Sequence, residues 1–356
     1  MSRGGAHFSS EEVAQVLSHY DIGVIHQAKP LSAGNRRAPK MVIISENGKY
    51  LLKRRPKGKD DLYRVAFSHS VQMHLGEKGF PVTSLVATRD EKNTVLQLDN
   101  HIYEFFKFIT GYRYDGSAEA TLDSGRQLGN FHNYLSDFAS EWQPLRGSFH
   151  DSSTVRRQLK VISSNRNKVD GGDTVDAFVI EGGRDKGLSR TVESLMLLYN
   201  KSSVRVNELG FDFWEQQVVH GDWHPGNMLF SGKNLVAVLD FDSVKVSPAV
   251  TDLANGMLQF SIVGGRPNPA DWPAYLDEGK LVQFFEGYRE VVELEKVKSD
   301  SLLDLMIETI IAEAVLPVAT TGFFGHLSGS DFLKMIHRKA EWIDKNRGTL
   351  SDAMGR

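Results

Sequence analysis

Apolar positions in the first third of the chain form short strand-like runs around one helical stretch. The pair Asn47-Gly48 lies between two such runs and is typical of a tight hairpin turn. Apolar residues recur at helical spacing over 62–75, and Ser9 with Glu12 forms a capping-box pattern that predicts a short helix before the first strand. The predicted strands are 41–45, 49–53, 94–98 and 101–109.

Long helical patterns dominate after Gly111. They cover about 118–138, 187–206, 279–293, 300–316 and 330–345, and one compact strand region at 218–244 interrupts them. The sequence therefore predicts an α+β protein with a β-rich N-terminal lobe at 1–106, a hinge at 107–111 and a helical C-terminal lobe at 112–356.

Composition excludes several classes of function. The 356 residues carry a formal net charge of −3, so charge gives no reason to expect nucleic acid as a partner. Cysteine is absent, which excludes disulfides, thiolate metal sites and cysteine nucleophiles. No apolar run reaches the roughly 18 residues of a membrane span, and the N-terminus lacks the apolar core of a signal peptide. We expect a cytoplasmic protein that does not enter a membrane.

Two neighbouring motifs carry the candidate chemistry, H-G-D-W-H-P-G-N at 220–227 and V-L-D-F-D at 238–242. Phosphoryl transfer requires a carboxylate that orients the acceptor hydroxyl and takes its proton, and Asp222 suits this role. Asn227, five residues later, and Asp240, after an apolar run, offer hard oxygen ligands of the kind that Mg²⁺ prefers. The Asp-to-Asn spacing is that of the catalytic loop in protein kinases.

These motifs, followed by T-D-L-A at 251–254, resemble the aminoglycoside phosphotransferase and choline kinase superfamily, and within it they look most similar to type II homoserine kinases and spore-coat kinase-like proteins. Further similar segments are YLLK (50–53), GFPV (79–82), YEFFKFITG (103–111) and LGNFH (128–132). The resemblance implies a bilobal protein-kinase-like fold and an enzyme that uses ATP and Mg²⁺ to phosphorylate a hydroxyl group of a small molecule.

The resemblance also implies roles for single residues in the catalytic region. Asp222 would be the catalytic base, and Asn227 and Asp240 would hold Mg²⁺. His220 would be a structural part of the catalytic loop, and Asp252 would brace that loop without touching substrate.

The expected nucleotide site lies in the N-terminal lobe. Lys53 would neutralise the α- and β-phosphates of ATP. The backbone of Lys107 and Ile109 would meet adenine, with Phe106 just before them. Gly34 is the one glycine in the segment expected to cover the phosphates.

One part of the family pattern is missing. Lys53 should pair with a glutamate on the following helix, but the register measured back from Phe80-Pro81 brings Ser68 or His69 to that place. Glu77 lies too close to the end of the helix to replace it. The sequence leaves open which group partners Lys53.

Other enzyme classes are disfavoured by motif order. His220, Asp222 and His224 could bind the metals of a phosphoesterase, but the D-x-H at 99–101 and the G-N-F-H at 129–132 do not complete its motif set. The D-F-D-S-V at 240–244 also matches the D-x-D-x-V motif of haloacid-dehalogenase-type phosphatases, but that motif normally opens the fold.

Several charged and aromatic positions have ordinary structural explanations. In the basic run 53–59 only Lys53 is expected to act on the nucleotide, and the rest is interpreted as a solvated face. The aromatic residues of 103–108 are interpreted as core. Asp242 is either a second metal ligand or a structural residue, and the structural role is favoured.

The remaining alternatives concern turnover and substrate. Eleven residues separate Asp240 from Asp252, which leaves little room for a peptide-binding segment and argues against a protein kinase. A pseudokinase that binds nucleotide without turnover stays open, as does the oligomeric state. The acceptor could be homoserine, another amino alcohol, a sugar or an aminoglycoside.

Overall fold

The computed structural model describes residues 7–31, 38–164 and 186–355, which pack as two compact units. The first unit combines the chain up to residue 115 with 130–145 and 226–245. The second unit comprises 116–129, 146–225 and the chain from 246 onward. Residues 226–245, far along the sequence, therefore pack in the same unit as the N-terminal strands.

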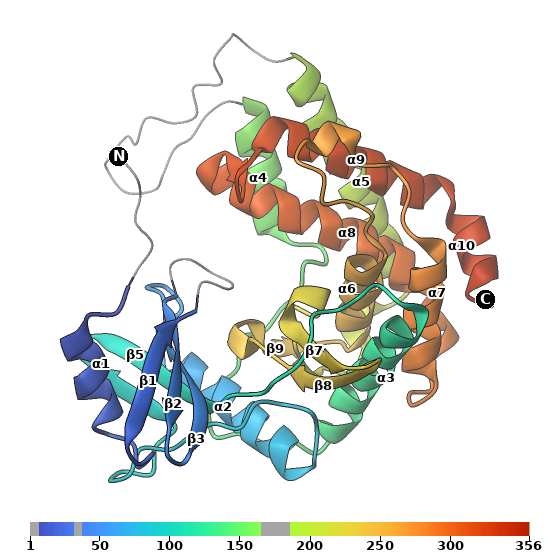
Figure 1. The fold of residues 1–356 in the computed structure, drawn as a ribbon. Helices are drawn as coiled ribbons and strands as arrows, with labels where there is room; N and C mark the ends of the chain where they lie inside the picture. The colour runs from blue at the N-terminus through green and yellow to red at the C-terminus, as the bar shows by residue number, and fades with distance from the viewer. Residues whose placement is uncertain (1–6, 32–37, 165–185, 356) are drawn as a thin grey trace. The chain divides into compact units, whose positions relative to one another are not determined.

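An antiparallel five-stranded sheet forms the centre of the first unit (Figure 1). Its strands, in spatial order, are β1 (Ile25–Pro30), β2 (Lys40–Ser45), β3 (Gly48–Arg54), β5 (His101–Lys107) and β4 (Val95–Leu98). The predicted hairpin between β2 and β3 is present, but its two turn residues are Glu46 and Asn47, and Gly48 is already the first residue of β3, opposite Ser45. Asp99 and Asn100 connect β4 to β5 with φ angles of +46° and +60°, the left-handed conformation that two-residue hairpin turns favour. Strand β1 was not predicted.

The two faces of this sheet differ because side chains alternate along each strand. One face buries Ile43, Leu52 and Phe105 against helix α1 (Ser10–Leu17). The capping box of α1 is confirmed, since the Ser9 hydroxyl accepts from the Glu12 N–H at 3.0 Å. Residues on the alternate positions of β3 and β5 lie on the opposite face, and it is this face that carries the candidate site.

Helix α2 (Leu62–Glu77) begins at its N-cap Asp61, whose side chain accepts from the Arg64 N–H. A hairpin of β7 (Met228–Ser231) and β8 (Asn234–Val238) completes the first unit. The Val238 N–H donates to the carbonyl of Pro81, just beyond α2, at 2.8 Å. This bond fixes the short segment after β8, which contains Asp240 and the 3-10 turn Phe241–Ser243.

The second unit is built from helices. They are α4 (Ser153–Ser164), α5 (Lys186–Glu208), α6 (Val250–Ser261), α7 (Glu278–Arg289), α8 (Lys296–Thr321), α9 (Gly329–Lys345) and α10 (Arg347–Ala353), and α3 (Ala118–Tyr134) begins in this unit. Its shorter elements are the strands β6 (Gln217–Val219), β9 (Lys245–Ser247), β10 (Phe323–Phe324) and β11 (Leu327–Ser328) and the 3-10 turns Phe211–Phe213 and Pro269–Asp271. Helix α8 is its core, because α4, α5, α6 and α9 all pack against it (Figure 1).

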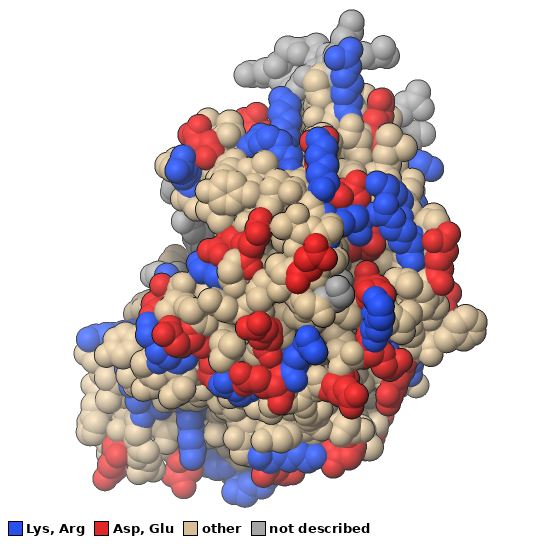
Figure 2. Space-filling model, turned by 90° about the vertical axis from the view of Figure 1, so that its right-hand side faces the viewer, with Lys and Arg blue, Asp and Glu red and all other residues tan. Residues whose placement is uncertain are grey.

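The predicted fold class is confirmed, with a β-rich N-terminal unit and a helical second unit. All five predicted long helices are present with shifted ends, whereas α4, α6 and α10 were not predicted. Among the described residues, every helix is too short or too polar to span a bilayer. On the face drawn in Figure 2, acidic and basic side chains of the described residues are interspersed, in keeping with the small net charge.

Candidate active site

The candidate site grows from the register between strands β3 and β5. Lys53 lies directly opposite Glu104 in this antiparallel pair, so the two side chains emerge on the same face of the sheet. Arg55, two residues after Lys53, returns to that face. All three are buried, with 9% of the Lys53 side chain and 1% of the Glu104 side chain exposed. Arg54 turns the other way and pairs with Glu12.

Lys53, Arg55 and Glu104 form a closed charge cluster with Asp242 in the first unit. Lys53 Nζ lies 2.9 Å from Asp242 Oδ1 and 3.4 Å from Glu104 Oε2. The Arg55 guanidinium lies 2.7 Å from Glu104 Oε1 and 3.0 Å from Asp242 Oδ1. Each cation thus touches both carboxylates, while Asp240 lies further out, at 3.6 Å from Lys53.

Helix α2 contributes His69 and Ser68 to the surroundings of this cluster. The His69 ring places Nε2 at 2.9 Å from Glu104 Oε1 and Nδ1 at 2.9 Å from Thr94 Oγ1. Ser68 accepts a hydrogen bond from Arg55 at 3.4 Å. Ser68 and His69, which the sequence register brings near the expected glutamate position, thus contact Arg55 and Glu104, and the carboxylate beside Lys53 comes from strand β5.

Electrostatics keeps these buried groups ionised. Burial alone would raise the pKa of Glu104, but the charges of Lys53 and Arg55 lower that pKa well below its ordinary value. Burial likewise opposes the charge on Lys53, and Glu104 with Asp242 and Asp240 outweighs it, so that the pKa of Lys53 is raised. Lys53, Arg55 and Glu104 thus stay charged at neutral pH.

A cavity of about 220 Å³ opens over this face of the sheet. It brings together four residues singled out in the sequence, and its lining includes Lys53, Phe106, Asn227 and Asp240. The Leu239 N–H donates to the carbonyl of Asn227 at 2.8 Å, which ties the two predicted metal ligands to neighbouring strands.

The donor set of this cavity fits Mg²⁺. The amide of Asn227 and the carboxylate of Asp240 are hard oxygen donors, and Mg²⁺ commonly takes one or two such protein ligands together with phosphate oxygens and water. Asp240 also adopts a left-handed backbone conformation, with φ of +58°, which is uncommon outside glycine and concentrates at functional sites. Within the described ranges, His, Asp and Glu side chains form no group of three or more arranged to hold a metal.

The catalytic-loop motif belongs to the second unit up to Pro225. Asp222 follows strand β6, and 42% of its side chain is exposed, with His224 Nε2 at 3.7 Å from its carboxylate. The preceding Gly221 has φ of +74°, a conformation that favours glycine. The buried Asp252 carboxylate accepts from the backbone N–H groups of His220, at 2.5 Å, and Gly221, at 2.8 Å. The expectation that Asp252 braces the loop is confirmed.

Other predicted contacts remain predictions. Lys107 and Ile109 are not among the residues that line the cavity, and the Lys107 N–H donates to the carbonyl of Ser84 at 2.9 Å. Gly34 lies outside the described residues.

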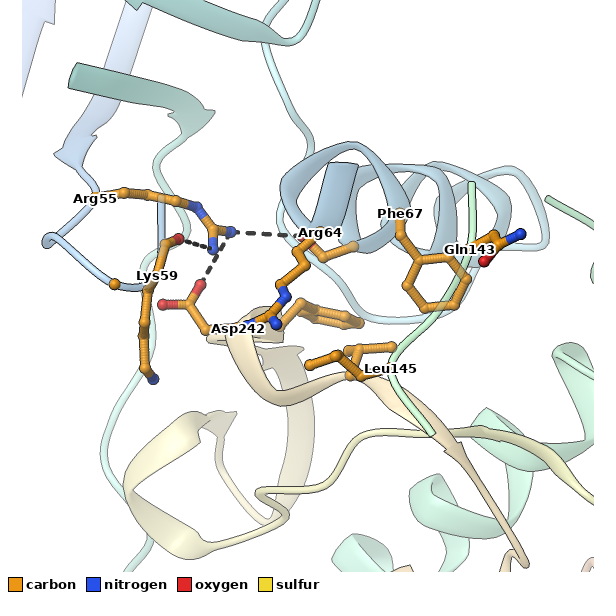
Figure 3. A pocket seen from close by; sticks show the side chains of 11 residues that line it. Arg55, Lys59, Arg64, Phe67, Gln143, Leu145 and Asp242 are labelled. Atoms are coloured by element: carbon orange, nitrogen blue, oxygen red, sulfur yellow. Dashed lines mark hydrogen bonds and ion pairs between the residues drawn. The ribbon is translucent and has the colours of Figure 1, made fainter. Parts of the chain in front are cut away.

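Arg55 and Asp242 also line a second cavity, of about 200 Å³, in the first unit. Figure 3 shows the Arg55 guanidinium joined to Asp242 and to the carbonyl of Lys59, with Arg64 of α2 close by. Arg55 and Asp242 thus line both cavities. The interpretation of the basic run 53–59 as a solvated face was wrong for Arg55, whose side chain is buried, whereas Lys57 and Lys59 are exposed.

Sequence reasoning also missed Glu104. The available signal was a single carboxylate within the apolar run of β5, which only the register with β3 turns into a partner for Lys53.

Comparison with known families gives one match over most of the chain. The model of the phosphotransferase enzyme family matches residues 27–294. A search among curated protein sequences gives no match.

Solved structures show the same fold at low sequence identity. An amicoumacin kinase in complex with AMP-PNP and Ca²⁺ is 13% identical, with a TM-score of 0.67, and the match covers 95% of this chain and 94% of that one. A microcompartment-associated aminopropanol kinase is 14% identical, with a TM-score of 0.67 and coverages of 98% and 99%. Choline kinase from Cryptosporidium parvum is 14% identical, with a TM-score of 0.57 and coverages of 97% for both chains.

Proposed function

Because this chain belongs to the phosphotransferase enzyme family, we propose that it is a kinase that transfers the γ-phosphoryl group of ATP to a hydroxyl group of a small molecule. The observation that carries the proposal is the cavity over the sheet, where a fixed ammonium and two hard oxygen donors line one space. That combination suits the phosphates of a metal-bound nucleotide, for which catalysis rests on positioning and charge neutralisation.

Each residue of the cavity has a defined task in this proposal. Lys53 offsets negative charge on the α- and β-phosphates, because its ammonium is held charged by neighbouring carboxylates. Asn227 and Asp240 hold Mg²⁺, which when bound neutralises charge on the phosphates. Phe106 and the backbone of Lys107 and Ile109 receive the adenine, and Gly34 belongs to the segment that covers the phosphates.

Asp222 is the base of the proposed reaction. Its carboxylate accepts the proton of the acceptor hydroxyl while a bond forms between that oxygen and the γ-phosphorus. The bond from the γ-phosphorus to the bridging oxygen breaks, and ADP leaves with the electron pair. The hydrogen bonds from His220 and Gly221 to Asp252 hold the loop on which Asp222 stands.

The similar solved structures indicate which nucleotide and which acceptors should be tested first. The amicoumacin kinase was crystallised with an ATP analogue and a divalent cation, which supports ATP with Mg²⁺ as the co-substrate of this chain. Aminopropanol and choline are both amino alcohols. We therefore place amino alcohols, with homoserine among them, ahead of sugars and aminoglycosides. The nearness to type II homoserine kinases and spore-coat kinase-like proteins stays a prediction.

The test is Mg²⁺-dependent ATP consumption by the purified protein over a panel of amino alcohols, homoserine, sugars and aminoglycosides. We expect at least one acceptor to be phosphorylated, and Asp222→Asn to reduce turnover by about 10³-fold or more while nucleotide affinity stays unchanged, because it removes only the base. A variant with wild-type turnover would refute the role of Asp222. Mg-ATP binding without turnover on any acceptor would favour a pseudokinase, and absence of binding would refute the proposed function.

A further inference from the structure

Glu104 is the most deeply buried charge of the first unit that the proposed reaction does not use. Its side chain is 1% exposed, and three nitrogen-bearing side chains converge on it, from Arg55 at 2.7 Å, His69 at 2.9 Å and Lys53 at 3.4 Å. A carboxylate buried to this degree needs such partners, because an isolated buried charge is strongly unfavourable. The question is what this arrangement does for the neighbouring cavity.

The surroundings of Lys53 show what would happen without Glu104. Its ammonium carries three donors, and the other two carboxylates within reach are Asp242, at 2.9 Å, and Asp240, at 3.6 Å. Asp240 is a proposed metal ligand. If Glu104 lost its charge, Lys53 would be drawn toward the two aspartates and would compete with the metal for Asp240.

Glu104 is itself fixed from two sides. Arg55, the residue directly after the end of β3, approaches Oε1 at 2.7 Å. His69 approaches Oε1 from helix α2 with its Nε2 at 2.9 Å, while its Nδ1 lies 2.9 Å from the Thr94 hydroxyl oxygen. The carboxylate therefore has little freedom to move, and its second oxygen, Oε2, is the one that faces Lys53.

We propose that Glu104 is the positioning residue for Lys53 and supplies from strand β5 the carboxylate that the family pattern expects on the following helix, with His69 on that helix holding Glu104 in place. This inference rests on the proposed kinase function, since it assigns Glu104 an effect on the nucleotide site. It also assigns Arg55 and Asp242 to the support of the cluster, with Asp242 outside the metal site.

A double-mutant cycle tests the proposal with nucleotide affinity as its readout. The Kd for AMP-PNP with Mg²⁺ is measured by calorimetry for the wild type, Glu104→Gln, Lys53→Met and the double variant. We expect Glu104→Gln to weaken binding by about tenfold, the size of a lost charge-assisted hydrogen bond. In the Lys53→Met background the same change should alter the Kd by less than about twofold, because the two residues act as one unit.

Glu77→Gln is the matched control. It removes the same charge from an exposed position on α2, and its Kd should equal that of the wild type. The inference would be overturned if Glu104→Gln weakened nucleotide binding equally in both backgrounds, or did not weaken it in the wild-type background. A weaker Kd for Lys53→Met than for the wild type would then still support the nucleotide site. A wild-type protein that does not bind Mg-AMP-PNP would instead overturn the kinase proposal and this inference with it.

A second variant covers the case in which Glu104→Gln does not fold. His69→Glu combined with Glu104→Gln places a carboxylate on α2 instead of on β5. In the wild type, the Nε2 atom of His69 lies 2.9 Å from Oε1 of Glu104, so a side chain at position 69 reaches this region. We expect this protein to bind Mg-AMP-PNP within about fivefold of the wild type, as partial rescue of a coupled pair predicts. Binding as weak as that of Lys53→Met would refute the proposal.

Discussion

Asp252 holds the loop that contains Asp222 through two hydrogen bonds, and the expected effect of its substitution can be derived from them. The two oxygens of Asp252 accept separate backbone N–H groups, from His220 at 2.5 Å and from Gly221 at 2.8 Å, and the carboxylate is buried. Asp252→Asn keeps one carbonyl oxygen and turns an NH₂ group toward the other N–H. One charge-assisted hydrogen bond worth about 1.5–3 kcal/mol is lost, and a buried N–H loses its acceptor.

The expected cost is therefore about 2–4 kcal/mol of unfolding free energy, measured by urea denaturation. Turnover should fall by about 10²-fold, because a misplacement of Asp222 by about 1 Å suffices for a loss of that size. Asp271→Asn, an exposed aspartate in the same unit, is the control and should change neither quantity. If Asp252→Asn unfolds at the wild-type urea concentration and turns over at the wild-type rate, the loop is held by other contacts and the reasoning fails.

Two further predictions concern the metal and the packing of helices. Asp240→Ala should weaken Mg-ATP binding, and removal of Mg²⁺ by chelation should weaken wild-type binding far more than binding by the variant; equal Mg-ATP affinities for the two proteins would refute Asp240 as a ligand. Gly287→Ala should lower the unfolding free energy by about 1–3 kcal/mol, because the new methyl group would lie 1.9 Å from the Leu122 carbonyl oxygen. Gly76→Ala, where the methyl group would meet only Val82 at 3.7 Å, should raise it by about 0.5–1 kcal/mol, and a common sign for the two substitutions would contradict the packing argument.

Local sequence signals were sufficient for much of the fold. The β2–β3 hairpin and the capping box at Ser9 depend on residues a few positions apart, and both are present, although the turn lies at Glu46-Asn47, one residue before the predicted Asn-Gly turn. The long helices were predicted from periodicity, which depends only on burial along one face. Helix α6 was missed because it contains Asn255-Gly256, a dipeptide that favours turns in local sequence reasoning.

In the candidate site too, residues in short motifs were predictable from the sequence, whereas residues brought together by the fold were not. Asp222, Asn227 and Asp240 were singled out because short motifs fix their spacing. Glu104 could not be paired with Lys53 from spacing alone, since 50 residues of chain separate the two and only the β3–β5 register brings them opposite each other. Arg55 was within reach of local reasoning, because alternation places it on the same face as Lys53.

The charge cluster is better explained by ligand binding than by stability of the fold. Taking ions out of water costs several kcal/mol each, and apolar residues of similar size often serve a protein core as well or better than a buried ion pair. The opposite face of the same sheet shows that alternative, since Ile43, Leu52 and Phe105 pack there against α1 without a charge among them. The charged face would be a poor choice for a sheet that only had to pack, yet it borders the cavity that contains Asp240. In the proposed reaction, the ammonium of Lys53 beside that aspartate would meet the phosphates of the nucleotide, and Glu104 would help to keep it charged and in place.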